Sequence, residues 1–356
     1  MAVWNTRKAA AAAAKVAKGE DEAPVEAADL PYLGSLRDMP PGLVFIFGCH
    51  RSGTTLLYHL LAESGRFNYV TAYDLIKYDE LLRNHLQGRT EEVREELDRE
   101  IRARQADRVV DKLPVGAGLP EEYRFVLAGE VDDPFKQARE MIFAPNLTDA
   151  TKDKFIELCR KKQLTAEESL PLLLKNPSDF YKNFLAIAGM FPDQKSIIIH
   201  RHPLKIINSL VVNWDLIFKD QSHYLSMLDR QYARLFDAPP IARNITRSFL
   251  RSAFNARLLV SGMIDGFSYY LQNIGAMPAG SCIELRYEDF CREPGRHLDE
   301  IGAFLGTPLE LDLAGLSTEP RRQEVLPVIR RAYDRKAKQF APYLAQLGYD
   351  TYPADG

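Results

Sequence analysis

The chain has 356 residues, a length that favours one large α/β domain with a helical elaboration. Its 46 basic and 49 acidic residues leave a formal net charge of −3, which argues against a nucleic-acid-binding protein, whose surface needs an excess of positive charge. The four cysteines lack CxxC pairing, which argues against a zinc knuckle or a disulfide framework and favours a reducing, cytoplasmic location.

Residues 1–38 are alanine-rich and then acidic, and we expect them to form a flexible tail. The run Ala9–Ala14 is too weakly apolar for the core of a signal peptide, and Lys15 and Lys18 follow at once. No apolar run approaches the roughly 18 to 20 residues that a membrane span requires. We therefore expect a soluble protein with a single domain over residues 39–352.

The first predicted strand is Leu43–Phe47, a short and continuously apolar run between a Pro-Pro-Gly turn and a glycine. Such a run is typical of a parallel strand that is buried on both faces. The following segment, Thr54–Glu63, places leucines at helical spacing. The order is therefore strand, loop, helix.

The middle of the chain is predicted to be helical. Leu81–Arg108 is densely charged, with alternating signs at distances that suit i,i+4 pairing on a solvated helix. Gly116–Pro120 is a turn-rich break, and Phe135–Leu174 has helical patterning punctuated by two prolines. We expect a helical insertion over about residues 82–170, beside the sheet.

Two more strand candidates follow, at Lys195–His200 and Ser281–Tyr287. The first precedes the apolar helix Leu204–Val212, and the second precedes a helix that contains Leu298 and Ile301. Alternating strands and helices predict a parallel sheet covered on both faces. The predicted fold class is α/β, with a P-loop-like parallel β-sheet flanked by helices and carrying helical insertions.

The loop Gly48–Thr55 has the frame of a phosphate-binding loop, in which backbone N–H groups and a helix N-terminus surround an anion. A nucleotide triphosphatase would have lysine after the second glycine, whereas two threonines follow here. A plain glycine turn capped by serine and threonine is the alternative without a ligand. The groups available to a phosphate are those of Arg51, Ser52, Gly53, Thr54 and Thr55.

These residues resemble the sulfotransferase loop that binds the 5′-phosphosulfate of PAPS (3′-phosphoadenosine 5′-phosphosulfate), with His50 where that family usually has proline. A second segment, Arg201–Ser209, resembles the family's 3′-phosphate motif, an arginine at a strand end and a serine eight positions later. His202 stands where aspartate is common in the motif. An arginine leaving a strand and a serine about two turns into the next helix can converge on one phosphate.

Two further stretches extend the resemblance to roughly residues 42–306. Leu174–Pro177 is similar to a stretch of the tyrosyl-protein and bacterial branches, and Tyr287–Phe290 is similar to a later stretch of the family. The resemblance implies that Lys175 assists the leaving group and that Tyr287 belongs to the cofactor site.

The resemblance also implies a reaction: transfer of a sulfuryl group from PAPS to a hydroxyl or amine, with release of adenosine 3′,5′-bisphosphate and no metal requirement. Arg51 and the loop amides would hold the 5′-phosphate and its developing charge. The general base would be a carboxylate or a histidine. Asp74 is the preferred candidate, Glu121 and Glu122 are the alternatives, and His59 is expected to be packed.

The acceptor stays open between a carbohydrate, a lipid, a small alcohol, a phenol and a peptide tyrosine, because acceptor pockets come from variable insertions. One rival function is a P-loop kinase or nucleotide triphosphatase, which Thr54 in the lysine position disfavours. The other rival is a non-catalytic relative that kept the PAPS site. The intact Arg51, Lys175, Arg201 and Ser209 argue against such decay.

Overall fold

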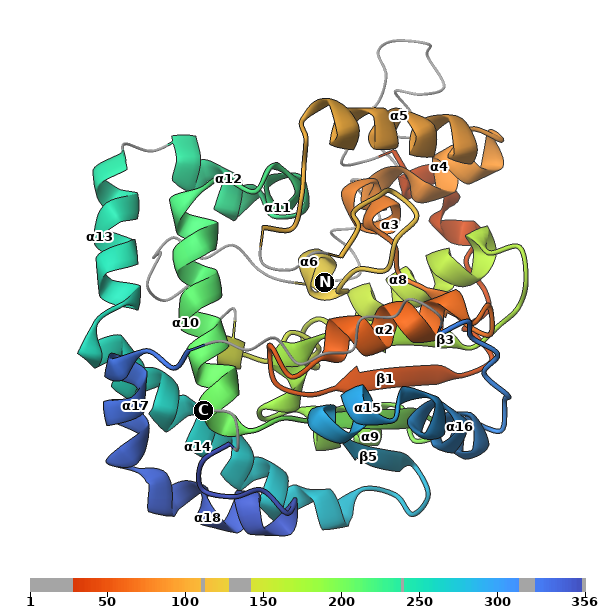
Figure 1. Cartoon of the computed structure of the whole chain (residues 1–356). Coiled ribbons are helices and arrows are strands. Elements are labelled where there is room, and N and C mark those ends of the chain that lie inside the picture. Colours follow the sequence, from red (N-terminus) through yellow and green to blue (C-terminus); the bar gives the residue numbers. More distant parts are fainter. Residues whose placement is uncertain (1–27, 110–112, 128–141, 238–239, 314–323, 354–356) are drawn as a thin grey trace.

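The computed structural model describes residues 28–109, 113–127, 142–237, 240–313 and 324–353. Within these ranges, five parallel strands form one sheet in the order β2-β3-β1-β4-β5 (Figure 1). The strands are β1 (Leu43–Phe47), β2 (Asn68–Tyr69), β3 (Leu172–Lys175), β4 (Lys195–His200) and β5 (Cys282–Arg286). The expected α/β fold, a parallel sheet flanked by helices, is confirmed.

The central strand β1 is apolar throughout because both of its faces are covered. Phe45 and Phe47 belong to one hydrophobic core, whereas Val44 and Ile46 belong to the other. Successive side chains of a strand point to opposite faces, so a strand that contacts two cores needs an apolar residue at every position. The sequence pattern of β1 therefore follows directly from its central place in the sheet.

Different helices cover the two faces of the sheet (Figure 1). The core on one face includes side chains from α2 (Thr54–Glu63), α15 (Tyr287–Arg292) and α16 (Pro294–Leu305). The core on the other face is larger and includes side chains from α8 (Lys152–Thr165), α9 (Phe184–Met190) and α14 (Ala253–Asn273). The sheet is thus the middle layer of three.

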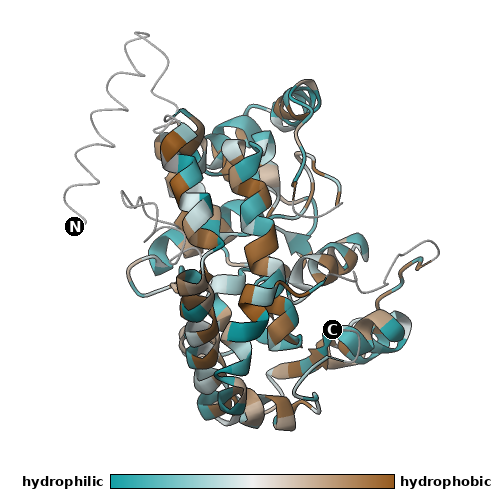
Figure 2. Ribbon diagram, turned by 60° about the vertical axis from the view of Figure 1, so that its left-hand side comes forward, coloured by the Kyte–Doolittle hydropathy of each residue, from teal (hydrophilic) through white to brown (hydrophobic). Residues whose placement is uncertain are grey.

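Most of the remaining described helices also contribute side chains to the larger core. The remaining helices are α3 (Ala72–Ile76), α4 (Leu81–Leu86), α5 (Thr90–Ala103), α6 (Arg124–Leu127), α10 (Pro203–Lys219), α11 (His223–Leu228), α12 (Arg230–Asp237), α13 (Pro240–Leu250), α17 (Pro327–Asp334) and α18 (Ala337–Gln346). Short 3₁₀ helices span Leu30–Ser35, Tyr78–Glu80, Pro177–Phe180 and Ile274–Ala276. The helices that come forward in Figure 2 alternate hydrophobic and hydrophilic bands, as expected of helices that pack by one face.

The chain differs from the sequence prediction around β3. Helical structure is expected through Leu174, whereas α8 ends at Thr165 and Leu172–Lys175 forms a strand with all four residues buried. Pro171 cannot continue a helix, and the apolar run behind it fills the position between β1 and β2. Residues 135–141 of the predicted helical stretch lie outside the described residues.

The end of the predicted N-terminal tail is packed against the domain. Residues 1–27 lie outside the described residues, but Ala28 and Asp29 are buried. The Asp29 carboxylate accepts hydrogen bonds from the backbone of Leu82 and Arg83 at the start of α4, and it forms an ion pair with Lys161. The ordered domain therefore begins before residue 39. Among the described helices, none has both the length and the apolar character needed to cross a membrane.

Candidate active site

The carboxyl ends of the strands position the candidate site. The chain leaves β1 to form β2 and β3 on one side of it, and later forms β4 on the other side. In open parallel sheets, ligands bind in the crevice outside the strand ends where the chain changes direction in this way. Three segments meet there: the loop after β1, Lys175 at the end of β3, and Arg201 directly after β4.

The loop after β1 is a sharp turn that requires glycine. Gly53 caps the N-terminus of α2 with φ at 99°, in the left-handed region, and a Cβ atom at this position would overlap the ring of Tyr287. Arg51 is also left-handed, with φ at 68°. The first N–H groups of a helix have no acceptor within the helix, and the first turn of α2 contains no acidic residue. The turn therefore offers donors to an anion.

Ser52 shapes this loop from inside. Its hydroxyl is fully buried and donates a hydrogen bond to the carbonyl of Cys49 at 2.7 Å. Ser52 is absent from the described residues that line the neighbouring pocket, whereas Arg51, Thr54 and Thr55 line it. The Ser52 side chain thus stabilises the turn.

The two predicted phosphate motifs lie side by side. The Arg51 side chain donates from Nε to Ser209 Oγ at 3.3 Å, and Arg201 donates from Nη1 to the Arg51 carbonyl at 2.7 Å. The Arg201 guanidinium also lies over the ring of Tyr287, 4.6 Å from its centroid. Segments 150 residues apart in the sequence are thereby brought together at one end of the crevice.

His202, the residue that replaces the family's aspartate, caps α10. Its Nδ1 accepts a hydrogen bond from the Leu204 amide at 3.2 Å, and its Nε2 donates to the carbonyl of Asp350 at 3.0 Å. Burial lowers the pKa of His202 to about 4, so the ring is neutral and keeps an acceptor for the helix amide. Histidine can stand here because it provides the acceptor that aspartate would provide.

The C-terminal segment is held near this cap by further contacts. Arg286, at the end of β5, donates to the carbonyl of Gly348 at 3.2 Å. The Tyr349 hydroxyl donates to Glu288 at 2.6 Å, and Glu288 in turn accepts from the amide of His202 at 3.3 Å. Residues 348–350 therefore bridge the ends of β4 and β5.

Lys175 joins the loop to a carboxylate. Its side chain is 2% exposed, and its ammonium group donates to Thr55 Oγ1 at 2.8 Å and to Glu122 Oε1 at 2.6 Å. Burial would raise the pKa of Glu122, but the charges of Lys175, His50 and Arg124 outweigh it and hold this pKa at about 2. The site therefore contains a buried ion pair in which Glu122 is ionised.

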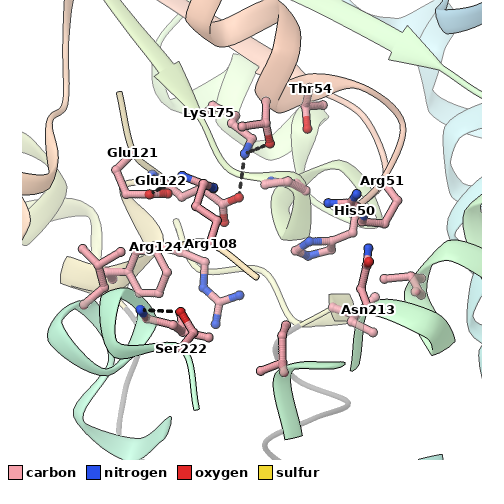
Figure 3. A pocket seen from close by; sticks show the side chains of 18 of the residues that line it. His50, Arg51, Thr54, Arg108, Glu121, Glu122, Arg124, Lys175, Asn213 and Ser222 are labelled. Carbon is pink, nitrogen blue, oxygen red and sulfur yellow. Dashed lines mark hydrogen bonds and ion pairs between the residues drawn. The ribbon is translucent and has the colours of Figure 1, made fainter. Parts of the chain in front are cut away.

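A pocket of about 160 Å³ opens beside this pair (Figure 3). The loop and Lys175 line one part of it, and Glu121, Glu122, Arg108 and Arg124 surround another part. Apolar side chains from α10 and α11 complete the described lining. The pocket thus contacts the loop after β1, a cation and a carboxylate at once.

The three candidate bases lie in different places. Asp74 is buried in α3, where it closes a capping box with Thr71 and pairs with Lys162 at 2.8 Å, and it is absent from the described pocket lining. Glu121 and Glu122 both line the pocket, but Glu121 accepts hydrogen bonds from Arg108 and Tyr224. Glu122 is therefore the carboxylate in contact with Lys175, the lysine that bonds to the loop through Thr55.

Several pocket residues do not follow from the sequence pattern. Arg124 lines the pocket although it belongs to no motif, and His50 lines it although the loop motif gives it no role as a ligand. The spacing of the sequence could have identified Asn213, because it lies one helical turn after Ser209 and donates to its hydroxyl at 3.4 Å.

His59 is buried in α2, as expected of a packed residue. Within the described ranges, no group of three His, Cys, Asp or Glu side chains is arranged to hold a metal ion.

Comparisons with known proteins give a consistent result. The sulfotransferase family model matches residues 41–311. The fold is similar to that of sulfotransferase STF9 from Mycobacterium avium, with a TM-score of 0.58 and 17% identity over 90% of this chain and 80% of that one. It is also similar to that of sulfotransferase STF1 from Mycobacterium tuberculosis H37Rv, with a TM-score of 0.54 and 15% identity over 88% and 81% of the two chains. No match is found among curated proteins.

Proposed function

The chain belongs to the sulfotransferase family, and on this basis we propose that it transfers a sulfuryl group from PAPS to a hydroxyl or amine acceptor and releases adenosine 3′,5′-bisphosphate. The observation that carries the proposal is the position of Lys175. This one cation contacts both the end of the anion-binding loop, at Thr55, and the carboxylate of Glu122 in the adjoining pocket.

The residues present fit a donor that carries two phosphates. The N-terminus of α2 and the side chain of Arg51 suit the 5′ end of the donor, and Arg201 with Ser209 suits its 3′-phosphate. These cations lie at the carboxyl edge of the sheet, which is where open parallel sheets generally bind their ligands, and this supports the proposal. PAPS, when bound, supplies the sulfuryl group and departs as adenosine 3′,5′-bisphosphate.

The residues of the chain divide the chemistry between them. Arg51 and the loop amides stabilise the negative charge that grows on the departing phosphate oxygen. Lys175 donates a hydrogen bond to that oxygen, and Glu122 takes the proton from the acceptor. We assign the base to Glu122 rather than Asp74, because both Asp74 contacts serve α3 and α8 and its carboxylate is buried away from the loop.

The ion pair couples these two roles. In the free protein, Lys175 keeps Glu122 ionised and weakly basic. When Lys175 turns toward the donor, Glu122 loses its nearest cation and gains a negative neighbour, and both changes raise its pKa. Glu122 therefore becomes a stronger base when the donor is in place.

The test is binding followed by turnover. Adenosine 3′,5′-bisphosphate should raise the melting temperature in the presence of EDTA, whereas ATP with magnesium should not. Stabilisation by magnesium and ATP alone would support a kinase and overturn the proposal. Release of the bisphosphate from PAPS with a mixture of acceptors then tests catalysis. Binding without turnover on any acceptor class would indicate a non-catalytic relative.

A further inference from the structure

We propose that the acceptor is a hydrophobic molecule bearing a single hydroxyl group, an alcohol or a phenol, rather than a saccharide. The inference rests on the proposed function, because it assigns the pocket beside Lys175 and Glu122 to the acceptor. It follows from two properties of the lining: a large apolar surface, and polar groups that are already engaged with one another.

The apolar surface comes mainly from two helices. From α10, the pocket is lined by Leu210, Trp214 and Ile217, and from α11 by Leu225 and Leu228. Phe125 adds an aromatic ring beside them. Burial of apolar ligand surface against such side chains is the main source of affinity for small molecules.

The polar lining residues outside the donor loop are bonded within the protein. The Glu121 carboxylate accepts from Arg108 at 2.7 Å and from the Tyr224 hydroxyl at 3.0 Å. The Ser222 hydroxyl donates to the carbonyl of Asp107 at 2.8 Å. Each hydroxyl of a sugar that enters the pocket loses its hydrogen bonds to water and needs new partners in the protein. These residues could bond to the sugar only by breaking the hydrogen bonds that they already form.

Both carboxylates of the pocket are paired with cations. Arg108 pairs with Glu121, Lys175 pairs with Glu122, and the charge of Arg124 acts on Glu122 as well. A charged acceptor would have to lose its own hydration to enter this pocket. A single hydroxyl needs only the carboxylate of Glu122, which is placed to accept its proton.

Lengthening an alkyl acceptor should increase the apolar surface that it buries against the side chains of α10 and α11.

The experiment measures kcat/KM for PAPS-dependent sulfation by the full chain with matched acceptors. Cyclohexanol and inositol have the same six-membered carbon ring but carry one hydroxyl and six. Butanol, hexanol and octanol test the contribution of the apolar side chains of α10 and α11. To test the effect of charge, para-butylphenol is compared with the same phenol carrying a carboxylate at the end of its chain. We expect cyclohexanol to exceed inositol by at least 100-fold, and kcat/KM to rise about fourfold per methylene along the alcohol series.

Substitutions of apolar residues that line the pocket test whether the preference for hydrophobic alcohols arises there. Ile217→Ser and Leu225→Ser change half-buried side chains that line the pocket, and Ile217 also packs against the larger core, so kcat/KM is compared for protein shown to be folded. Each should lower kcat/KM for octanol about tenfold, with a smaller effect for butanol. The control is Leu216→Ser, a half-buried residue of α10 outside the described pocket lining, which should leave octanol turnover unchanged.

The outcomes separate this inference from the proposed function. Failure of adenosine 3′,5′-bisphosphate to bind would defeat the proposed function itself. If the bisphosphate binds and some acceptor is sulfated, then faster sulfation of inositol than of cyclohexanol, a preference for the carboxylated phenol, or no transfer to any hydrophobic alcohol or phenol would overturn the inference alone. Equal octanol turnover in Ile217→Ser, Leu225→Ser and the wild type would also overturn it.

Discussion

Arg201 donates a hydrogen bond from Nη1 to the backbone carbonyl of Arg51 at 2.7 Å, so the residue that follows β4 supports the loop that follows β1. The contact links the two predicted phosphate sites across the point where the sheet order reverses. A substitution at one of these sites should therefore alter the geometry of the other.

Replacement of Arg201 tests this link. Arg201→Met removes a charged donor and the support of the Arg51 carbonyl, and hydrogen bonds to charged groups are worth about 1.5–3 kcal/mol. We expect the affinity for adenosine 3′,5′-bisphosphate to fall roughly 10- to 100-fold, as measured by isothermal titration calorimetry. Arg292→Met is the matched control, because Arg292 is an exposed arginine bonded to Asp289 on the surface of α15. Equal affinities in the two variants would contradict the assigned role of Arg201.

The buried pair of Lys175 and Glu122 predicts an asymmetry in stability. Lys175→Met leaves the Glu122 carboxylate buried without its nearest cation, which should lower the free energy of unfolding by about 3–5 kcal/mol. The double variant Lys175→Met with Glu122→Gln removes both charges and should regain most of this loss. Urea unfolding of the wild type and both variants measures the difference. A double variant no more stable than the single one would show that the pairing contributes little.

The choice between Glu122 and Asp74 is a kinetic question. Glu122→Gln should lower kcat by about 10²- to 10⁴-fold with little change in the affinity for the bisphosphate, because it removes the base. Asp74→Asn should instead lower the unfolding free energy and leave kcat of the folded enzyme nearly unchanged, since it disturbs a helix cap and a buried ion pair. The reverse pattern would restore Asp74 as the base.

His202 predicts a pH dependence of stability. Its pKa is about 4 in the folded chain against an ordinary value of 6.5, so the unfolded chain binds the proton more tightly. Stability should fall as the pH is lowered from 6.5 to 4, by on the order of 3 kcal/mol at the lower limit. Glu122 acts in a separate window, because its depressed pKa makes its contribution fall only below about 4.5.

The variant His202→Asn isolates this effect. Asparagine keeps an acceptor for the Leu204 amide but does not titrate. Melting temperatures measured from pH 7 to 5 should decline less steeply in the variant than in the wild type. Parallel pH profiles would show that other groups control the decline.

Parts of the fold and site followed from the sequence because they depend on local chemistry. The strands β1 and β4 lie where buried apolar runs precede helices, β5 lies between a Pro-Ala-Gly turn and a helix, and the turn at Gly53 is visible from its glycine and threonines. Strand β3 was misplaced because a run of three leucines after a proline has no period that separates strand from helix. Strand β2 has two residues, too few to form any pattern.

The sequence does not identify the general base, for a different reason. Asp74, Glu121 and Glu122 are all acids next to turns, and nothing in their neighbours distinguishes them. In the structure, each acid forms an ion pair with a different cation: Asp74 with Lys162, Glu121 with Arg108 and Glu122 with Lys175. Each of these contacts except that of Glu121 joins segments more than 50 residues apart, so tertiary packing decides which acid serves the loop.

Residues 348–350 contact His202, Glu288 and Arg286. These contacts connect the end of the described chain to the part of the site that we propose binds the donor. Carboxypeptidase digestion past Asp350 would remove the acceptor of the His202 ring and loosen the start of α10, where Ser209 is carried. Occupancy of the donor site should accordingly slow such digestion, which makes protease resistance of this segment a label-free readout of ligand binding.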